Sequence, residues 1–425
     1  MPTRLTLFAI VGLASGCAPT PREVPDPSLD GPKTWSGVIG PLVATRCGIC
    51  HRGGDIAPFP LELYAQVKLM GPSVLAAVET RSMPPFPPEQ SDESGCPRVD
   101  DIRRMSDAER EVLIAWLKDG MPEGEPGKEP TIPTNEPLGP PSDQWQMSEE
   151  YVSASDAPDD YRCIIIDPKV VTSIPVGAVS VKPGNRKVVH HSAVYLVPPE
   201  QANIVRRLDA DEPGPGYTCF GGVGVAEAYP TGIWVPGNDA PLVPPHGGVG
   251  YYLLPGWVFV VQQHYNYSGG KSPDRSTVVL WRANTFLSEV PHSLVTGTLD
   301  FSIPPMAMGH TVSSDAIIVP GGQTAAVWNE ANEGRVYSVW AHQHQLGRSF
   351  SMELVRPDGS TQCLLKIPRW DFNWQSIYRL KSFVDVKPGD KVRTTCTWDN
   401  PRTSEVHYGE GTADEMCLGS LALLK

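Results

Sequence analysis

The sequence is short of positive charge. Lys and Arg together number 35, against 48 Asp and Glu, so the formal net charge at pH 7 is -13. A surface with this excess of negative charge repels the phosphate backbone of nucleic acids and anionic lipid headgroups alike. We therefore expect no nucleic acid partner, and we expect contact with a membrane only through a lipid anchor.

Long hydrophobic runs are also scarce. The run LTLFAIVGLA near the start follows Arg4 and is too short to span a bilayer as a helix. It leads through ASGC to Cys17, an order typical of a bacterial lipoprotein signal, whose cysteine is acylated after cleavage. Residues 1–17 are therefore predicted to be a lipoprotein signal peptide, with ordinary secretion as the alternative. The mature chain is expected to be exported, at the periplasmic face or cell surface, and lipid-anchored to the outer membrane.

Patterns for long helices are few. The chain has 45 Pro and 40 Gly spread among short apolar runs, which favours strands and turns. After residue 150, segments such as DYRCIIIDP, KVVHHSAVYLV and DKVRTTCTWDN have strand length and are rich in β-branched or aromatic residues. Because they do not alternate with long helices, we predict an all-β sandwich class for this part of the chain.

A haem motif stands near the start of the chain. Residues 43–59, VATRCGICHRGGDIAPF, contain Cys47, Cys50 and His51 in the order C-x-x-C-H. This order is typical of c-type haem attachment, because two thiols at this spacing bond the haem vinyl groups while the histidine ligates the iron. A disulfide or a zinc site is the alternative interpretation. The motif predicts one covalent c-type haem.

The end of this haem-binding region can also be predicted. Ser106 and Glu109 form a capping box, the helix that follows has one apolar face, and Gly120 stops it. The next stretch, MPEGEPGKEPTIPTNEPLGPPSD, is rich in proline and reads as a stiff extended linker. We predict a small all-α cytochrome c domain over residues 35–125 and a Pro-rich linker over residues 126–150.

The sixth ligand of such a haem is expected to be a thioether. Met83 in TRSMPPFPP is the candidate, because an exposed methionine held by a Pro-Pro turn is poorly explained as core; Met70 and Met105 are its rivals. Ligation by Met and His raises the haem potential. A haem tethered through a short linker would act at an effective concentration on the order of millimolar.

The remaining cysteines point to disulfides. Apart from Cys17 and the haem pair, six are left, which an exported chain is expected to bridge. Six cysteines allow 15 connectivities, and the sequence alone does not choose among them. They are Cys96, Cys163, Cys219, Cys363, Cys396 and Cys417.

Histidine is clustered on the predicted strands. His342 and His344 form an H-x-H, and residues two apart on a strand face the same side, so they can chelate one ion. His190 and His191 are adjacent and would face opposite sides of a regular strand, so they share a metal only if the strand bulges or ends there. His264 follows VVQQ. Each histidine alone is explained as a surface or hydrogen-bonded residue, but the clustering favours a metal.

The ordered series of these motifs resembles the copper type II, ascorbate-dependent monooxygenases, the family of peptidylglycine α-hydroxylating monooxygenase and dopamine β-monooxygenase. The series runs from the His pair through QQHY and HQHQLG to DEMC with Met416, and WDFNWQSIY and VKPGDKVRTTCTWDN are further matches. The resemblance covers roughly residues 150 to 425. It implies two consecutive copper-binding sandwich domains, expected at 151–290 and 291–425. The N-terminal region similarly resembles the cytochrome modules fused to such domains in bacterial proteins.

The resemblance also implies two copper ions with different roles. His190, His191 and His264 would hold the electron-storing copper. His342, His344 and Met416 would hold the copper that binds oxygen and abstracts hydrogen. Imidazoles alone would suit zinc equally well, whereas a soft thioether favours Cu(I), so Met416 is the discriminating ligand.

Disulfide pairs follow from the same resemblance. It implies a bridge between Cys163 and Cys219, and another between Cys396 and Cys417 that would fix the loop of Met416. Cys96 and Cys363 then remain. A bridge between these two would staple the haem region to the copper region.

The sequence departs from the peptide-amidating enzymes of the family. They hold a substrate carboxylate with an Arg before the H-x-H and with Asn and Tyr after the Met, where this chain has Trp340, Leu418 and Ser420. A glycine-extended peptide is therefore not the expected substrate, and Trp340 indicates a more apolar or aromatic one.

The functional hypothesis is a copper-dependent monooxygenase that hydroxylates a C–H bond of a small organic substrate with O₂. Electrons would be supplied or relayed by the fused haem, with ascorbate, another reductant or a redox partner protein as their source. The alternatives are an exported haem and copper electron-transfer or copper-holding lipoprotein without hydroxylase activity, and a structural sandwich protein with incidental histidines.

Overall fold

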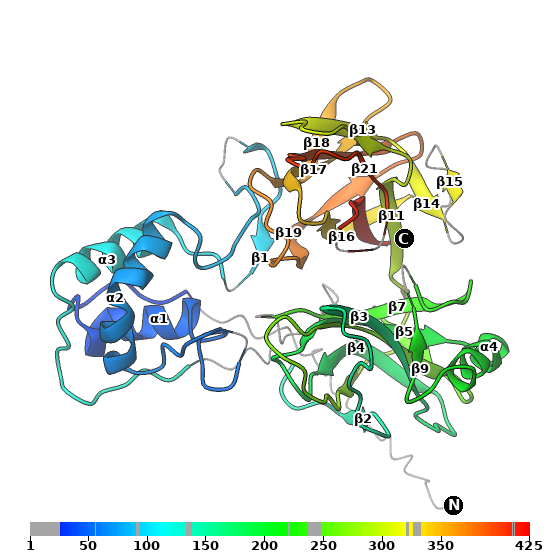
Figure 1. The fold of residues 1–425 in the computed structure, drawn as a ribbon, viewed down its shortest axis with the longest axis horizontal. Coiled ribbons are helices and arrows are strands. Elements are labelled where there is room, and N and C mark those ends of the chain that lie inside the picture. Colours follow the sequence, from blue (N-terminus) through cyan, green and yellow to red (C-terminus); the bar gives the residue numbers. More distant parts are fainter. Residues whose placement is uncertain are drawn as a thin grey trace, which may run out of the picture.

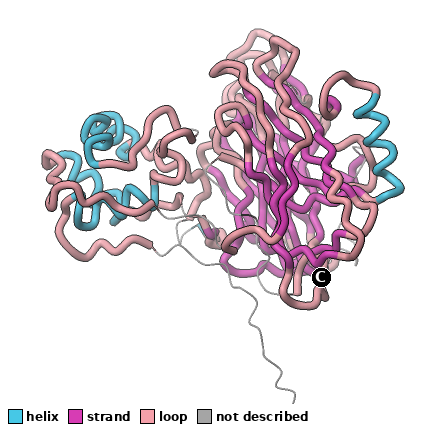
Figure 2. Tube along the Cα trace, turned by 90° about the horizontal axis from the view of Figure 1, so that it is seen from below, coloured by secondary structure: helices cyan, strands magenta, loops and turns pink. Residues whose placement is uncertain are grey.

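The computed structural model describes residues 26–55, 57–90, 94–101, 103–132, 138–219, 222–236, 241, 248–319, 323–325, 333–409, 411 and 413–425. The predicted signal segment, with Cys17, lies outside this part of the chain. Strands dominate, and the few helices gather mainly at one end of the molecule (Figures 1 and 2). Within the described residues, no helix combines the length and the apolar character needed to cross a membrane.

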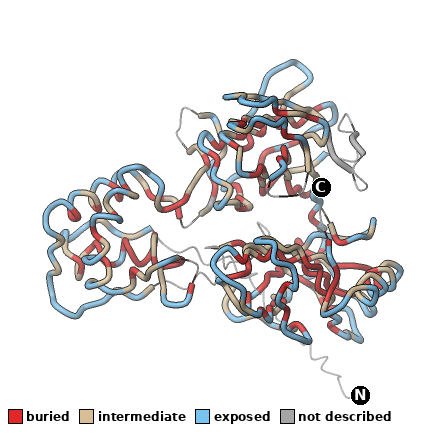
Figure 3. The backbone as a smooth tube through the Cα atoms, viewed as in Figure 1, coloured by how far each residue is buried: buried red, intermediate tan, exposed pale blue. Residues whose placement is uncertain are grey.

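The first sandwich is built from two sheets. The five-stranded sheet has the order β6-β3-β9-β5-β7, and the four-stranded sheet has the order β2-β10-β4-β8. Apolar side chains from both sheets form one buried core, and the buried residues are coloured red along the strands in Figure 3. The strands are β2 (Asp143–Gln146), β3 (Asp159–Ile166), β4 (Ile174–Lys182), β5 (Val189–Val197), β6 (Tyr217–Thr218), β7 (Tyr229–Trp234), β8 (Tyr251–Leu253), β9 (Val258–Asn266) and β10 (Thr277–Arg282).

One helix belongs to this sandwich. α4 (Pro199–Ala210) begins after the end of β5 and covers the outer face of the five-stranded sheet. Its Ala202 and Val205 pack against Val258 and Val260 of β9. The five-stranded sheet is therefore apolar on both faces, which explains the nearly continuous apolar run at the start of β9.

The second sandwich pairs a seven-stranded sheet with a four-stranded one. Their orders are β1-β19-β16-β22-β11-β14-β15 and β13-β20-β17-β18, and β12 pairs with β21 as a short ribbon. The core between the sheets includes side chains of β16, β17, β20 and β22. The strands are β11 (His292–Thr298), β12 (Ser302–Ile303), β13 (His310–Ser314), β14 (Ile317–Val319), β15 (Gln323–Ala325), β16 (Gly334–His342), β17 (Gly347–Val355), β18 (Thr361–Ile367), β19 (Ile377–Val386), β20 (Lys391–Trp398), β21 (Val406–His407) and β22 (Cys417–Leu424).

The helical region precedes both sandwiches. It contains a π-helical turn η1 (Trp35–Ile39) and the helices α1 (Gly40–Arg46), α2 (Tyr64–Glu79) and α3 (Asp107–Lys118), which share one apolar core. The capping box is present, because Ser106 Oγ accepts from the Glu109 amide at 3.2 Å. Gly120 has φ of +78°, the left-handed conformation that ends helices. The predicted boundaries of α3 are thus confirmed.

Two segments expected to be linker or coil are instead paired. The strand β2 lies within residues 126–150 and adds to the four-stranded sheet of the first sandwich. The short strand β1 (Val99–Asp100) of the helical region adds to the edge of the seven-stranded sheet of the second sandwich. Pairing of this kind depends on a distant partner strand, which the local sequence does not reveal.

The six cysteines assigned to bridges form three disulfides. They join Cys96 to Cys363, Cys163 to Cys219 and Cys396 to Cys417. The second and third pairs are those that the family resemblance implies, and the first joins the two cysteines that then remain. The third pair connects β20 to β22 and therefore ties the two sheets of the second sandwich together.

Candidate metal centres

Three histidines meet on two neighbouring strands of the first sandwich. His191 of β5 lies directly opposite His264 of β9, and the pairing shifts register between Val189 and His191. This bulge makes His190 the extra residue, so it turns to the same side as its neighbour. One ligand atom from each of His190, His191 and His264 lies within 4.8 Å of the others. The bulge that a shared metal requires is therefore present.

We call His190, His191 and His264 the three-histidine cluster. The contacts of their ring nitrogens show which nitrogen of each ring faces the other two rings. The Nδ1 atoms of His190 and His264 are 3.1 Å apart, and those of His190 and His191 are 3.4 Å apart. The opposite nitrogen of His264, Nε2, lies 3.0 Å from Asp159 Oδ1. Because the carboxylate fixes Nε2, the Nδ1 lone pair is left to face the other two rings. The cluster thus presents three Nδ1 atoms to one point.

Burial keeps the imidazoles of His190 and His191 neutral. It is the largest cause that lowers the pKa of His190 to about 4, and the neighbouring His264 lowers it further. The pKa of His191 falls well below its ordinary value for the same two reasons. Neutral imidazole is the form that donates a lone pair to a metal, so the cluster is a ligand set at neutral pH.

The H-x-H motif lies where β16 ends in the second sandwich. The rings of His342 and His344 are 5.1 Å apart and nearly perpendicular. Gln375 Oε1 contacts Nδ1 of His342, and the Asp414 carbonyl lies 3.0 Å from Nδ1 of His344. With both Nδ1 atoms engaged, the Nε2 atoms are the ones that can bind a metal. Burial is the largest cause that lowers the pKa of His342 to about 3, so this ring is neutral as well.

Met416 lies beside this pair. Met416 directly precedes β22, in which Leu418 pairs with His342, and the adjacent Glu415 accepts a hydrogen bond from the His344 amide. The Met416 side chain is buried, with 7% of the residue exposed. We call His342, His344 and Met416 the two-histidine–methionine cluster.

A buried carboxylate organises this cluster, and the sequence analysis did not assign it a role. Glu415 is fully buried and accepts hydrogen bonds from the amides of His344 and Leu346, at 2.9 and 2.6 Å. It also accepts from the Trp398 indole at 2.9 Å. Glu415 therefore holds the turn after His342 against the strand that carries Met416. The only sequence signal was its place inside DEMC.

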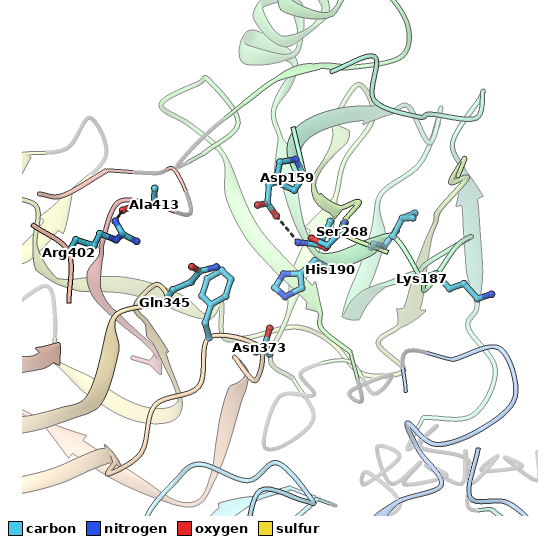
Figure 4. Close-up of a pocket in the computed structure, with 13 residues that line it drawn as sticks. Asp159, Lys187, His190, Ser268, Gln345, Asn373, Arg402 and Ala413 are labelled. Carbon is cyan, nitrogen blue, oxygen red and sulfur yellow. Dashed lines mark hydrogen bonds between the residues drawn. The ribbon is translucent and has the colours of Figure 1, made fainter. Parts of the chain in front are cut away.

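The two clusters approach each other across the boundary between the sandwiches. The Phe372 ring lies 6.0 Å from the ring of His190 and 5.9 Å from that of His344, measured between ring centroids. A pocket of about 590 Å³ opens here and is lined from the first sandwich by His190 and Asp159, and from the second by Phe372 and Gln345 (Figure 4). His190 of the three-histidine cluster thus lines this pocket, and from the other side Gln345, the neighbour of His344, reaches it.

The positions that would clamp a substrate carboxylate are apolar or neutral. Trp340 pairs with Ser420 and His342 with Leu418, so all these residues lie together at the end of β16. The Trp340 ring stacks on the His342 ring at 5.2 Å, with an angle of 13° between the planes. An indole therefore stacks on His342 near the position where the family resemblance implies a cation.

The C-x-x-C-H motif lies just after α1. Cys47 and Cys50 are outside the three disulfides. His51 Nδ1 lies 2.9 Å from the carbonyl of Phe59, which leaves Nε2 for a metal ligand. Burial is the largest cause that lowers the pKa of His51, so its ring is neutral.

The three candidate methionines differ in their surroundings. Met105 is buried in the core shared by the helices, and Met70 packs against that core. Met83 is half-buried at the turn that precedes two prolines. The two rivals therefore already serve as core residues, whereas Met83 keeps its place as the candidate sixth ligand.

Comparison with known proteins supports the copper type II monooxygenase family. Residues 306–422 match the sequence profile described as copper type II ascorbate-dependent monooxygenase, C-terminal domain. MOXD1 homolog 1 of Drosophila melanogaster is 26% identical over 202 residues, which is 44% of this chain and 27% of that protein. Tyramine beta-hydroxylase of Caenorhabditis briggsae is 26% identical over 259 residues, which is 56% of this chain and 40% of that protein.

A shorter match also supports this family. Dopamine beta-hydroxylase of Canis lupus familiaris is 32% identical over 85 residues, covering 20% of this chain and 14% of that protein. The chain thus spans less than half the length of each of these relatives. Among solved structures, the VP2 subviral particle of infectious bursal disease virus has a TM-score of 0.17 at 10% identity over 66% of this chain and 71% of that one, too little to carry an argument.

Proposed function

We propose that this chain is a copper-dependent monooxygenase that hydroxylates a C–H bond of a small organic substrate with O₂. The observation that carries the proposal is the pair of histidine clusters with different donor sets, which approach each other so closely that the Phe372 ring contacts His190 of one and His344 of the other. The overall reaction would consume the substrate, O₂, two electrons and two protons, and it would yield the hydroxylated product and water.

Two different sets of residues in the chain would hold the two coppers. His190, His191 and His264 would hold one copper through Nδ1, and Asp159 would keep the His264 ring in the required orientation. The two-histidine–methionine cluster would hold the second copper through two Nε2 atoms and a thioether. Copper supplies the one-electron chemistry that activates O₂, and a soft thioether favours its Cu(I) state.

The N-terminal helical region fits a covalent c-type haem. Cys47 and Cys50 would bond it, His51 Nε2 would ligate the iron on one side, and Met83 would do so on the other. Arg110 supports this fit, because its Nη1 donates to the Val78 carbonyl at 2.6 Å while its buried Nε has no hydrogen-bond partner within the described residues. A haem carries carboxylates that would satisfy such a group. The haem would supply single electrons.

We propose a substrate that is small and apolar or aromatic. Trp340 stands where the peptide-amidating enzymes have a cation, which removes the partner of a substrate carboxylate. Two of the relatives are named for the hydroxylation of tyramine and dopamine, which supports an aromatic substrate class. The reductant would be ascorbate or a redox partner protein. We also propose that the chain is exported and lipid-anchored through Cys17.

The test is to mature the full chain in a bacterial periplasm and to measure its cofactors and its activity. We expect one haem that resists acid-acetone extraction and two coppers per chain. We also expect O₂-dependent conversion of at least one phenylethylamine-like or other small aromatic substrate when ascorbate is supplied, with ¹⁸O from O₂ in the product.

Two results would contradict the proposal. Zinc in place of copper would remove the oxygen chemistry altogether. Two bound coppers without any ¹⁸O-labelled product across a broad screen would favour the alternative of an electron-transfer or copper-holding lipoprotein.

A further inference from the structure

The helical region is fastened to the second sandwich. β1 extends the seven-stranded sheet by pairing with β19, and the disulfide between Cys96 and Cys363 joins the segment before β1 to β18. The Glu89 amide also donates to the Lys366 carbonyl at 2.7 Å. These contacts are covalent or made by the main chain. The C-x-x-C-H region is therefore held in one place, and not merely tethered through its linker.

A buried arginine lies where the helical region contacts the second sandwich. Arg103 is 2% exposed, and its guanidinium binds the Asp101 carboxylate. Its Nη2 also donates to Ser376 Oγ at 2.7 Å. The residue before Ser376 is Gln375, whose Oε1 contacts Nδ1 of His342. One hydrogen bond and one peptide unit thus separate Arg103 from the side chain that orients His342.

Arg103 is also close in the chain to the core of the helical region. Met105, two residues later, lies in the buried core against which Cys47 of the C-x-x-C-H motif packs. Tyr378, two residues after Ser376 and on the same face of β19, is 1% exposed. Its hydroxyl has no hydrogen-bond partner within the described residues, although it lies near Arg103. A buried hydroxyl of this kind indicates an additional polar group at the interface.

The helical region also touches the first sandwich, but the connection there is longer. Asp55 lies 3.4 Å from Arg186, which precedes His190 by four residues. From Arg186 the route to the three-histidine cluster follows the main chain into β5. The route from Arg103 to His342 has fewer bonds and passes through two buried residues, Arg103 and Ser376. Electronic coupling falls with each added bond or gap.

We propose that Arg103 and Ser376 are positioning residues that make the two-histidine–methionine cluster the entry point for electrons from the haem. This inference rests on the proposed function. Each transfer would oxidise one ferrous haem to the ferric state and reduce one Cu(II) to Cu(I). Two transfers supply the two electrons that the hydroxylation consumes.

The experiment uses the full chain loaded with haem and copper and does not measure turnover. A laser flash with a photoreductant reduces the haem, and its reoxidation is followed as the electron passes to Cu(II). His264→Ala leaves copper only in the two-histidine–methionine cluster, and His342→Ala leaves it only in the three-histidine cluster. We expect rapid reoxidation to persist in His264→Ala and to slow at least about tenfold in His342→Ala.

A second set of variants tests the connecting residues in the His264→Ala background. Ser376→Ala removes only the hydroxyl and is expected to slow haem reoxidation by about tenfold, whereas Ser376→Thr, which keeps a hydroxyl, should restore it. Arg186→Gln is the matched control, because it breaks the contact with Asp55 on the other route and should leave the rate unchanged. Haem content, copper content and the copper EPR spectrum are measured for each variant.

The outcomes separate this inference from the function on which it rests. Equal reoxidation rates in His264→Ala and His342→Ala, or a loss of rate in Arg186→Gln but not in Ser376→Ala, would overturn the inference while leaving the copper monooxygenase intact. A chain that binds copper but no haem would overturn the inference alone, whereas a chain that binds no copper would overturn both.

Fixed docking also makes a prediction about the linker. If an engineered protease site within residues 133–137 is cut, the two pieces should remain together under non-reducing conditions and keep the rate of haem reoxidation. Loss of that rate on cutting alone would show that the linker, and not the docked interface, positions the haem.

Discussion

The two histidine clusters differ in which nitrogen of the imidazole ring is available to bind a metal. In the three-histidine cluster, a side-chain carboxylate holds Nε2 of His264 and the Nδ1 atoms converge. In the two-histidine–methionine cluster, amide and carbonyl oxygens hold the Nδ1 atoms of His342 and His344 and leave Nε2. The difference teaches that the partner of the second ring nitrogen, and not the histidine itself, decides which atom meets the metal.

The clusters also differ in how firmly the fold holds them. His191 and His264 lie opposite each other in adjacent paired strands, so the pairing of the sheet fixes their distance. His344 lies beyond the end of β16, and buried hydrogen bonds to Glu415 substitute for the missing strand pairing. We therefore expect the three-histidine cluster to be rigid and the other to depend on its supporting residues.

The largest expected effect separates the two clusters by function. His342→Ala and His264→Ala should each reduce hydroxylation to background, because the reaction needs both coppers. Each variant should nevertheless retain one of the two coppers, and the retained EPR signals should differ. Copper quantification and EPR on the two variants provide the check, and loss of both coppers in either one would contradict two independent sites.

A large effect on stability is expected at Glu415. Replacement by Gln leaves too few acceptors for the amides of His344 and Leu346 and the indole of Trp398, so buried donors lose their partner. We expect the free energy of unfolding to fall by about 3 kcal/mol. Chemical denaturation gives the measurement.

The matched control for this change is Glu405→Gln, which alters an exposed carboxylate near the same sheet edge. It should change stability by less than about 0.5 kcal/mol. If both variants unfold alike, Glu415 does not organise the turn after His342.

An intermediate effect is expected at Asp159. Asp159→Asn weakens the contact that orients His264 and should lower copper affinity at the three-histidine cluster by about 10- to 100-fold. The other cluster should be unaffected. Asp160→Asn is the control on the same strand, because Asp160 binds Tyr151 instead. Competition with a copper chelator measures both, and equal affinities in the two variants would remove Asp159 from the site.

The smallest effect is expected between the clusters. Phe372→Leu removes the ring that contacts His190 and His344, and aromatic contacts of this kind contribute about 1 kcal/mol. We expect hydroxylation to slow by only a few fold. The distance distribution between the two Cu(II) ions, measured by pulsed dipolar EPR, should broaden. An unchanged distribution would show that Phe372 does not set the spacing of the sandwiches.

The candidate ligands could be predicted from the sequence, but the residues that support them could not. The H-x-H spacing and the adjacent His pair indicate candidate ligands, and the bulge at His190 could be named as a requirement from the sequence. Asp159 and Gln375 could not be assigned, because each meets its histidine through long-range folding and not through spacing. Likewise, the local sequence of residues 99–100 does not predict that they pair with β19.

The most direct test of two chemically distinct copper sites is the copper K-edge X-ray absorption of the fully reduced, copper-loaded chain. The account predicts one thioether sulfur among the imidazole nitrogens for every two Cu(I) ions, and it predicts that Met416→Ile abolishes the sulfur signal while the three-histidine cluster stays occupied. A spectrum without sulfur, or one that Met416→Ile leaves unchanged, would contradict it.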